Sequence, residues 1–238
     1  MIKPIAGALA VLALALGSFA APQDAEQKPA PTEEQKREAE VVAAQAPSYP
    51  LDVCIVSGEK FTEESPAVDV VADGHLLRTC CKRCAKKVKE KSKGYIEKVQ
   101  KAVIRQQKDL WPLKSCPVSD DAYGGEMGDP IDMVVGTRYV KLCCGGCKKA
   151  VKKDPAAFLA KLDQKLIPEL AKSYPTQMCI VSGERLGSMG DPVNVMYGHR
   201  LVRFCCKGCI RAYKKDPAAW VAKIYSNEAA EKTSGGDK

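Results

Sequence analysis

Cysteine is the residue whose number and spacing in this sequence could do chemistry. The chain has 12 cysteines, and they divide into three sets of four, each a lone cysteine followed by a Cys-Cys-x-x-Cys motif. Between the lone cysteine and the motif lie 25 or 26 residues. The sets are Cys54, Cys80, Cys81 and Cys84; Cys116, Cys143, Cys144 and Cys147; and Cys179, Cys205, Cys206 and Cys209. Cysteines at fixed spacing are typical of metal sites or of disulfide frameworks.

Metal binding is the chemistry that this pattern favours. The thiolate is the metal-binding form of cysteine, and the free N–H groups at a helix N-terminus favour it. Four converging sulfurs suit tetrahedral Zn²⁺, and three or two suit Cu⁺. A module of about 60 residues also has a small core and commonly needs a metal ion or disulfides to stabilise it. We therefore predict one Zn²⁺ or Cu⁺ ion in each set, with all twelve cysteines as candidate ligands.

The three sets belong to three copies of one module. The lone cysteines lie 62 and 63 residues apart, and each opens a similar stretch such as Cys-Ile-Val-Ser-Gly. Copies two and three also share Lys-Lys-Asp-Pro-Ala-Ala, at residues 152–157 and 214–219. We place the modules at residues 51–112, 113–174 and 175–226.

Each copy has the same predicted order of elements. Between the lone cysteine and the doublet, two β-rich runs flank a two-residue loop that contains glycine, which is a strong hairpin signal. The paired runs are Val68 to Ala72 with His75 to Thr79, Ile131 to Val135 with Arg138 to Leu142, and Val193 to Tyr197 with Arg200 to Phe204. On the second run, Val202 and Phe204, and their counterparts Val140, Leu142 and Leu77, are expected to share one face.

Helical patterns follow each doublet. A first helix begins at the cysteines, and a supporting helix begins at Pro155 and at Pro217, where Asp154 and Asp216 are the expected N-caps. In the first copy the supporting helix is expected after Gly94. Its buried face is predicted at Ile96, Val99 and Val103 in copy one, at Phe158, Leu159, Leu162 and Leu166 in copy two, and at Trp220, Val221 and Ile224 in copy three. The sequence thus predicts an α+β fold of three tandem small modules, each with a cysteine turn, a β-hairpin, a cysteine-started helix and a supporting helix.

The two ends of the chain differ in composition from the modules. Residues 1–20 combine Lys3 with a short apolar run and small residues near Ala20, which indicates a secretory signal peptide rather than a membrane span. Residues 21–50 are rich in Ala, Pro and Glu and are predicted to be a disordered linker, and residues 227–238 a disordered tail. We expect an exported protein, in a bacterial periplasm, with no stable membrane insertion after signal cleavage.

Many of the lysine and arginine residues that give the chain its positive net charge lie beside the cysteine doublets. The formal net charge is +8. The flanking cations are Lys82, Arg83, Lys86 and Lys87; Lys148, Lys149, Lys152 and Lys153; and Lys207, Arg211, Lys214 and Lys215. They would offset the negative charge of metal–thiolate centres, or form a solvated helix face. Export and the lack of interleaved aromatic residues argue against a nucleic-acid partner.

The cysteine pattern resembles the TRASH and YHS domains, small treble-clef-like modules associated with heavy-metal sensing, trafficking and resistance. Their signature of one cysteine, a spacer and Cys-x-x-x-Cys at a helix start matches Cys54, Cys80 and Cys84; Cys116, Cys143 and Cys147; and Cys179, Cys205 and Cys209. The resemblance covers residues 51–226, but the Tyr-His-Ser tripeptide is absent and Thr79 replaces an apolar residue. It implies metal binding, trafficking or resistance, and a metal-transport or efflux protein as a partner.

The second cysteine of each doublet departs from that family pattern. In treble-clef zinc sites the opening turn donates two cysteines, whereas here serine occupies the second position, as Ser57, Ser119 and Ser182. Cys81, Cys144 and Cys206 could supply the fourth ligand that these serines replace.

Two other functions also fit a repeated set of cysteines. An exported protein meets an oxidising compartment, so a disulfide-stabilised interaction module without metal is the main alternative, although adjacent cysteines are hard to bridge. The Cys-x-x-Cys at a helix start also fits a thiol–disulfide oxidoreductase, but the βαβ units of such enzymes are lacking. No catalytic set recurs, so we expect no enzyme. His75 and His199 are not in repeated positions and are predicted to be surface residues, while packing is the expected role of Met127, Met178, Met189 and Met196.

Overall fold

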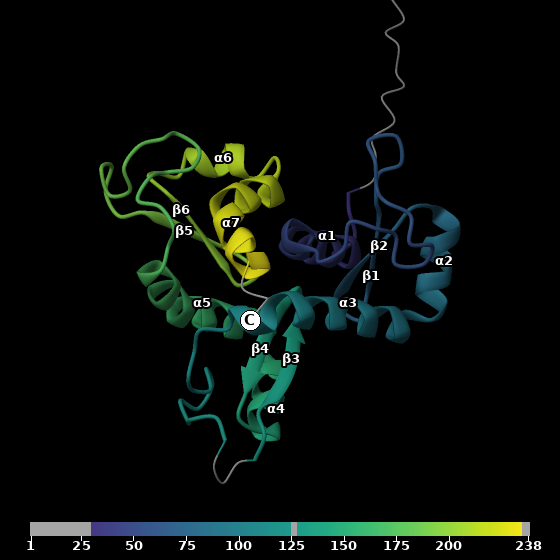
Figure 1. Cartoon of the computed structure of the whole chain (residues 1–238). Helices are drawn as coiled ribbons and strands as arrows, with labels where there is room; N and C mark the ends of the chain where they lie inside the picture. Colours follow the sequence, from purple (N-terminus) through teal and green to yellow (C-terminus); the bar gives the residue numbers. More distant parts are fainter. Residues whose placement is uncertain (1–29, 125–127, 235–238) are drawn as a thin grey trace, which may run out of the picture. The chain divides into compact units, whose positions relative to one another are not determined.

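The computed structural model describes residues 30–124 and 128–234 (Figure 1). The chain divides into two units, Met1–Thr32 and Glu33–Lys238, and every element named below belongs to the second. The predicted signal peptide lies outside the described residues, as does Met127. Among the described residues, no helix combines the length and apolar character needed to cross a membrane.

Three two-stranded antiparallel sheets are the β-structure of the described residues. Their strands are β1 Val68–Ala72 and β2 His75–Thr79, β3 Ile131–Val135 and β4 Arg138–Leu142, and β5 Val193–Tyr197 and β6 Arg200–Phe204. Each pair is in simple register about its two-residue turn, as Ala72 opposite His75 illustrates. In the first turn Asp73 and Gly74 both have positive φ, which two-residue hairpin turns require and these residue types tolerate. The predicted hairpins are confirmed.

A helix follows each hairpin, and a longer helix supports it. The first helices are α2 Lys82–Glu90, α4 Gly145–Lys153 and α6 Cys209–Tyr213, and the supporting helices are α3 Ser92–Gln107, α5 Pro155–Lys172 and α7 Pro217–Ser234. Asp154 caps α5 by accepting a hydrogen bond from the Ala157 N–H, and Asp216 does the same for the Ala219 N–H. In the first module α3 starts at Ser92 and includes Gly94, so the expected start after that glycine is wrong.

Each module has an apolar core between its hairpin and its supporting helix, and the core of module one also includes Val134 and Tyr139 of module two. The side chains of Leu77, Val140, Leu142, Val202 and Phe204 are fully buried, as the alternation along the second strands predicts. The helix residues that cover them and are buried are Ile96, Val99 and Val103; Phe158, Leu162 and Leu166; and Val221 and Ile224. Leu159 and Trp220 are partly buried at the edges of these cores.

The segment before the first module is not the disordered linker that its composition suggests. Residues 33–48 form the helix α1 Glu33–Gln45 and the short 3₁₀ helix η1 Ala46–Ser48. At the end of α1, the Gln45 side chain donates to the Gly74 carbonyl and accepts from the Leu76 N–H, at 2.8 and 2.9 Å. These tertiary hydrogen bonds order a segment that has little apolar surface of its own. Residues 21–29 lie outside the described residues.

The predicted disordered tail is also partly helical. The backbone of α7 continues to Ser234, with non-helical dihedral angles at Tyr225. A helix that has begun propagates at little further cost, so a segment of polar composition can continue it.

The three hairpin turns meet at a group of residues that we call the turn cluster: Gln45, Gln107, Trp111, Tyr139 and His199. Gln107, at the end of α3, donates to the Thr137 carbonyl and accepts from the Tyr139 N–H, repeating for the second turn what Gln45 does for the first. His199 in the third turn contacts the Tyr139 carbonyl through Nε2 and packs edge-to-face on Trp111, with ring centroids 5.2 Å apart. Successive modules are therefore joined through their turns.

His199 contradicts the prediction that it lies at the surface. Its side chain is only 2% exposed, and burial lowers its pKa to about 4, against the backbone hydrogen bond that raises it. A turn residue is buried here because the turn of one module packs on the strand of the module before it. His75, the first residue of β2, is partly exposed.

Candidate metal centres

The lone cysteine of each module sits in a tight loop closed by backbone hydrogen bonds. Cys54 N–H donates to the Glu59 carbonyl at 2.7 Å, and Gly58 N–H donates to the Cys54 carbonyl at 2.8 Å. Gly183 closes the third loop in the same way. The loop needs a residue with positive φ, which Gly58 and Gly183 supply and which Asp120 adopts in module two with φ of 65°. The shared Cys-x-Val-Ser stretch thus forms a local loop that orients the sulfur of the lone cysteine.

The other two sulfurs come from the end of the hairpin and the start of the helix. Cys80 directly follows β2, and Cys84 is the third residue of α2. Cys143 and Cys205 likewise follow β4 and β6, and Cys147 and Cys209 lie in the first turns of α4 and α6. Because the strand leads straight into the helix, the two cysteines end up on the side that faces the loop.

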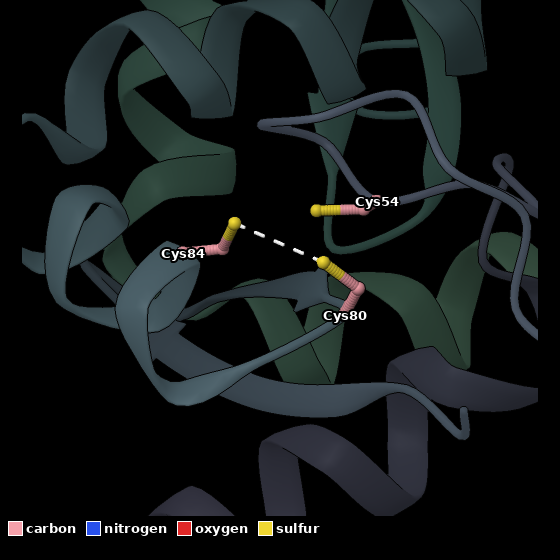
Figure 2. A group of neighbouring side chains, drawn as sticks. All are labelled: Cys54, Cys80 and Cys84. Carbon is pink, nitrogen blue, oxygen red and sulfur yellow. Dashed lines mark hydrogen bonds between the residues drawn. The ribbon is translucent and has the colours of Figure 1, made fainter. Parts of the chain in front are cut away.

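These elements bring three sulfurs together in every module. The groups are Cys54, Cys80 and Cys84; Cys116, Cys143 and Cys147; and Cys179, Cys205 and Cys209, and within each the sulfurs all lie within 4.8 Å of one another. Figure 2 shows the three sulfurs of the first group converging from the loop, the strand end and the helix. All nine cysteines are buried except Cys80, which is partly exposed.

The spacing of the sulfurs fits a thiolate-bound metal ion. The doublet and helix sulfurs are 3.8 Å apart in the first and third groups and 3.6 Å apart in the second. Ligands about 2.3 Å from a Zn²⁺ ion are separated by about 3.8 Å in a tetrahedral site. Each module therefore contains a three-cysteine cluster that could hold one ion.

The second cysteine of each doublet lies outside these clusters. Cys81, Cys144 and Cys206 are partly exposed, and none belongs to a group in which all sulfurs are within 4.8 Å. The Cys206 sulfur is nevertheless 4.0 Å from the Cys209 sulfur. That these three are ligands stays a prediction.

A serine hydroxyl lies at the edge of every cluster. The Ser57, Ser119 and Ser182 oxygens are 3.5, 3.4 and 3.3 Å from the sulfurs of Cys80, Cys143 and Cys205. The sequence places these serines where a treble-clef site has a second cysteine, but only the structure shows that the hydroxyl contacts the doublet sulfur.

The lone cysteine is the most acidic thiol of each buried cluster. Burial opposes ionisation of Cys54 and Cys179, but hydrogen bonds from the serine hydroxyl and nearby backbone N–H groups outweigh it and lower the pKa of both thiols to about 6. For Cys116, burial is likewise outweighed, chiefly by backbone N–H groups, and the pKa is lowered to about 7. In the metal-free protein, ionisation is therefore favoured at the lone cysteine of each cluster.

The helix cysteine is the least acidic. Burial, followed by contact with the neighbouring sulfurs, raises the pKa of Cys84, Cys147 and Cys209 to about 12. A cation placed among the sulfurs reverses this balance, because it stabilises every thiolate that it touches. The clusters are suited to binding a cation that displaces protons from the remaining thiols.

Residues outside the cluster hold the strand that carries the doublet. The hydroxyl groups of Tyr49 and Tyr174 accept from the backbone N–H groups of Arg78 and Arg203, two residues before each doublet, at 3.2 and 3.1 Å. In module two the Tyr123 hydroxyl donates instead to the Lys141 carbonyl at 3.0 Å. The sequence patterns did not single out these tyrosines, although an aromatic residue followed by proline lies just before the lone-cysteine loop of every module, as Tyr49, Trp111 and Tyr174.

Neither histidines nor disulfides take part in the three groups. His75 begins β2 and His199 lies in the third hairpin turn, both at the opposite end of the strand from the doublet. All twelve cysteines are within the described residues, and all are free thiols. Met178 and Met189 are 45% and 64% exposed, which contradicts the packing role expected for them, whereas Met196 packs against the core of module two.

Comparison of the chain with protein-family models, curated proteins and solved structures finds no match. The protein has three tandem modules, each with a three-cysteine cluster whose geometry is compatible with metal binding.

Proposed function

We propose that the protein binds a soft heavy-metal ion, Zn²⁺ or Cu⁺, in each of its three modules, and that it acts in metal binding, trafficking or resistance. The observation that carries this proposal is the convergence of three sulfurs in every module at the spacing of metal ligands. The resemblance of the cysteine pattern to TRASH and YHS domains supports the same function. Three thiolates satisfy Cu⁺, and a fourth donor at the serine edge, such as water, would complete a Zn²⁺ site.

The surrounding charge supports an anionic centre. A divalent ion held by three thiolates carries a net charge of about −1, and more with a fourth. Lys82, Arg83, Lys86 and Lys87 are exposed around the first cluster, and the other two modules have comparable cations. Their field lowers the free energy of the metal–thiolate complex without contacting the ion, since neither residue type is a usual ligand.

Export to a periplasm and delivery to a metal-transport or efflux protein are part of the proposal. They rest on the composition of residues 1–20 and on the family resemblance. A holding or delivery role also fits the lack of any repeated acid–base or nucleophilic set beside the clusters. We therefore propose that the protein is not an enzyme.

Elemental analysis tests this function. Protein purified under anaerobic conditions should contain three Zn²⁺ or Cu⁺ ions per chain, and a variant with Cys54, Cys116 and Cys179 all replaced by serine should contain none. The control variant replaces Ser65, Ser188 and Ser226, which hydrogen-bond to Thr62, Arg185 and Lys223, by alanine and should keep three ions. Protein with neither metal nor free thiols would instead support a disulfide-stabilised interaction module.

A thiol–disulfide oxidoreductase gives a different outcome in the same preparation. It would reduce insulin with turnover, and replacement of Cys84, Cys147 and Cys209 would abolish that turnover. We expect no turnover above the rate of free thiols, because three buried sulfurs around one point favour coordination over disulfide exchange.

A further inference from the structure

The second cysteine of each doublet has surroundings unlike those of the other three. Cys81, Cys144 and Cys206 are partly exposed, whereas eight of the nine cluster cysteines are buried. They are repeated in all three modules, yet none is in a cluster. An exposed thiol repeated beside a buried metal site points to a step that takes place at the surface.

Helix geometry puts this outer thiol next to one cluster sulfur. Cys81 and Cys144 are the N-cap residues of α2 and α4, and Cys84 and Cys147 are the third residues of those helices. The side chain of an N-cap residue turns toward the third residue of its helix, as in a capping box. In module three the outer sulfur of Cys206 is 4.0 Å from that of Cys209.

The helix cysteine is therefore shared between two groups of sulfurs. Cys209 is 3.8 Å from Cys205 inside the cluster and 4.0 Å from Cys206 outside it. An ion bound inside can keep its bond to Cys209 while it exchanges another ligand for Cys206. Two sulfurs at this spacing can hold an ion at the surface, as a Cys-x-x-Cys pair.

The surface at the outer thiol is open. In modules two and three, Gly146 and Gly208 lie two residues after the outer cysteine, and both glycines are exposed. A Cβ atom at either would lie 3.6 Å from the outer sulfur, so a longer side chain there would cover it. Exposed Lys82 and Lys207 directly follow two of the outer cysteines and favour the approach of an anionic donor.

We propose that Cys81, Cys144 and Cys206 are exchange ligands, through which the metal ion passes between the buried cluster and a partner protein that presents thiolates. This inference rests on the proposed function and names the step that delivery requires. In module three a bond from the ion to the Cys206 sulfur forms while its bond to the Cys179 sulfur breaks. The proton of the Cys206 thiol passes to the released Cys179 sulfur, and no electrons are transferred. The ion is then held by Cys205, Cys206 and Cys209, and on the side of the partly exposed Cys206 an incoming thiolate can reach it.

Transfer kinetics test the proposal. The full chain is loaded with Zn²⁺, and loss of the ion to an excess of the coloured chelator 4-(2-pyridylazo)resorcinol is followed by absorbance. Replacement of the three outer cysteines together (Cys81→Ser, Cys144→Ser and Cys206→Ser) should leave three ions bound and the equilibrium affinity within threefold, but slow transfer at least tenfold. The matched variant with Cys84→Ser, Cys147→Ser and Cys209→Ser should not hold the ions at all.

Alkylation gives a second measurement that does not depend on transfer. In the Zn²⁺-loaded wild type, iodoacetamide should modify the three outer cysteines first, while the nine cluster cysteines stay protected, as peptide mass spectrometry would show. Protection of all twelve would mean that the outer thiols are permanent ligands, and the exchange role would then be wrong.

The transfer rates distinguish failure of the exchange role from failure of the proposed metal-binding function. An unchanged transfer rate in the outer variant overturns the exchange role while metal binding stands, and loss of ions from that variant shows four-cysteine sites instead. If the wild type binds no Zn²⁺ or Cu⁺, both proposals fail together.

Discussion

The cysteine clusters and the turn cluster lie at opposite ends of the same hairpins. The residue types are repeated from module to module at the first end and vary at the second. At the doublet end all three modules use the same residue types, a lone cysteine, a serine and a cysteine pair, in the same geometry. At the turn end the modules differ: Gln45 and Gln107 serve the first and second turns, and His199 in the third turn contacts the second module.

The difference has a physical cause. Metal–thiolate bonds have fixed length and direction, so a repeated site admits few residue types. Packing between modules can be achieved by many combinations of volume and hydrogen bonding, and each turn meets a different neighbour. Repetition of residues therefore marks the chemistry, and divergence marks the contacts that join the modules.

The sharpest test of this contrast removes one cluster. Cys209→Ser deletes a sulfur of the third group, and we expect affinity at that site to fall by more than about 100-fold, leaving two ions per chain by elemental analysis. Met189→Ser, at an exposed position of the same module, should keep three. Loss of more than one ion in Cys209→Ser would show that the turn cluster couples the sites.

Truncation of a core side chain next to the third cluster should have the next largest effect, on the free energy of unfolding. Phe204 is fully buried directly before the doublet and packs on Tyr213, with ring centroids 5.3 Å apart. Phe204→Ala should lower the free energy of unfolding by about 3–5 kcal/mol, because it leaves a cavity. Phe204→Leu copies the Leu142 of module two and should cost about 1.5 kcal/mol or less in the same denaturant titration. Equal costs for both would mean that the site end is not tightly packed.

The turn cluster predicts a pH dependence of stability. The pKa of His199 is lowered by burial from 6.5 to about 4, and the Arg138 guanidinium nearby also disfavours the charged ring. The unfolded chain protonates this residue first, so the stabilisation is complete above pH 6.5 and is lost as pH falls toward 4, by about 3 kcal/mol at most.

Denaturation of reduced, metal-free protein between pH 7 and 4 measures this loss. His199→Gln should flatten the pH profile more than His75→Gln, because His75 is less buried, although burial lowers its pKa as well. An identical profile in wild type and His199→Gln would contradict a buried neutral ring.

The smallest effect is expected from the glutamines that hold the turns. Gln107→Ala leaves the Thr137 carbonyl and the Tyr139 N–H without their side-chain partner, and should cost about 2 kcal/mol in thermal or denaturant unfolding. The neighbouring Gln106→Ala removes an exposed bond to the Pro50 carbonyl and should cost about 0.5 kcal/mol or less. Both variants should still bind three ions. Loss of an ion in Gln107→Ala would show that the turn cluster affects metal binding at the cysteine clusters.

Much of each module follows from local sequence rules. The bounds of all six strands, the caps Asp154 and Asp216 and the buried positions of Val202 and Phe204 were predictable, because turn residues, capping side chains and alternation act over a few residues. The helix α1 was not, since its composition resembles a linker and its order depends on hydrogen bonds from Gln45 to residues some 30 positions away.

For the site, the sequence by itself determined the three sets of cysteines, their period and the module that carries them. Tertiary structure decided which sulfurs meet: the lone cysteine, the first of the doublet and the helix cysteine, with serine at the edge and the second doublet cysteine outside. It also decided that His199 is buried, because the turn of module three packs on a strand of module two, the module before it. Spacing along the chain sets which residues are available, but the direction of a side chain at a strand-to-helix junction depends on backbone dihedral angles that only the folded chain fixes.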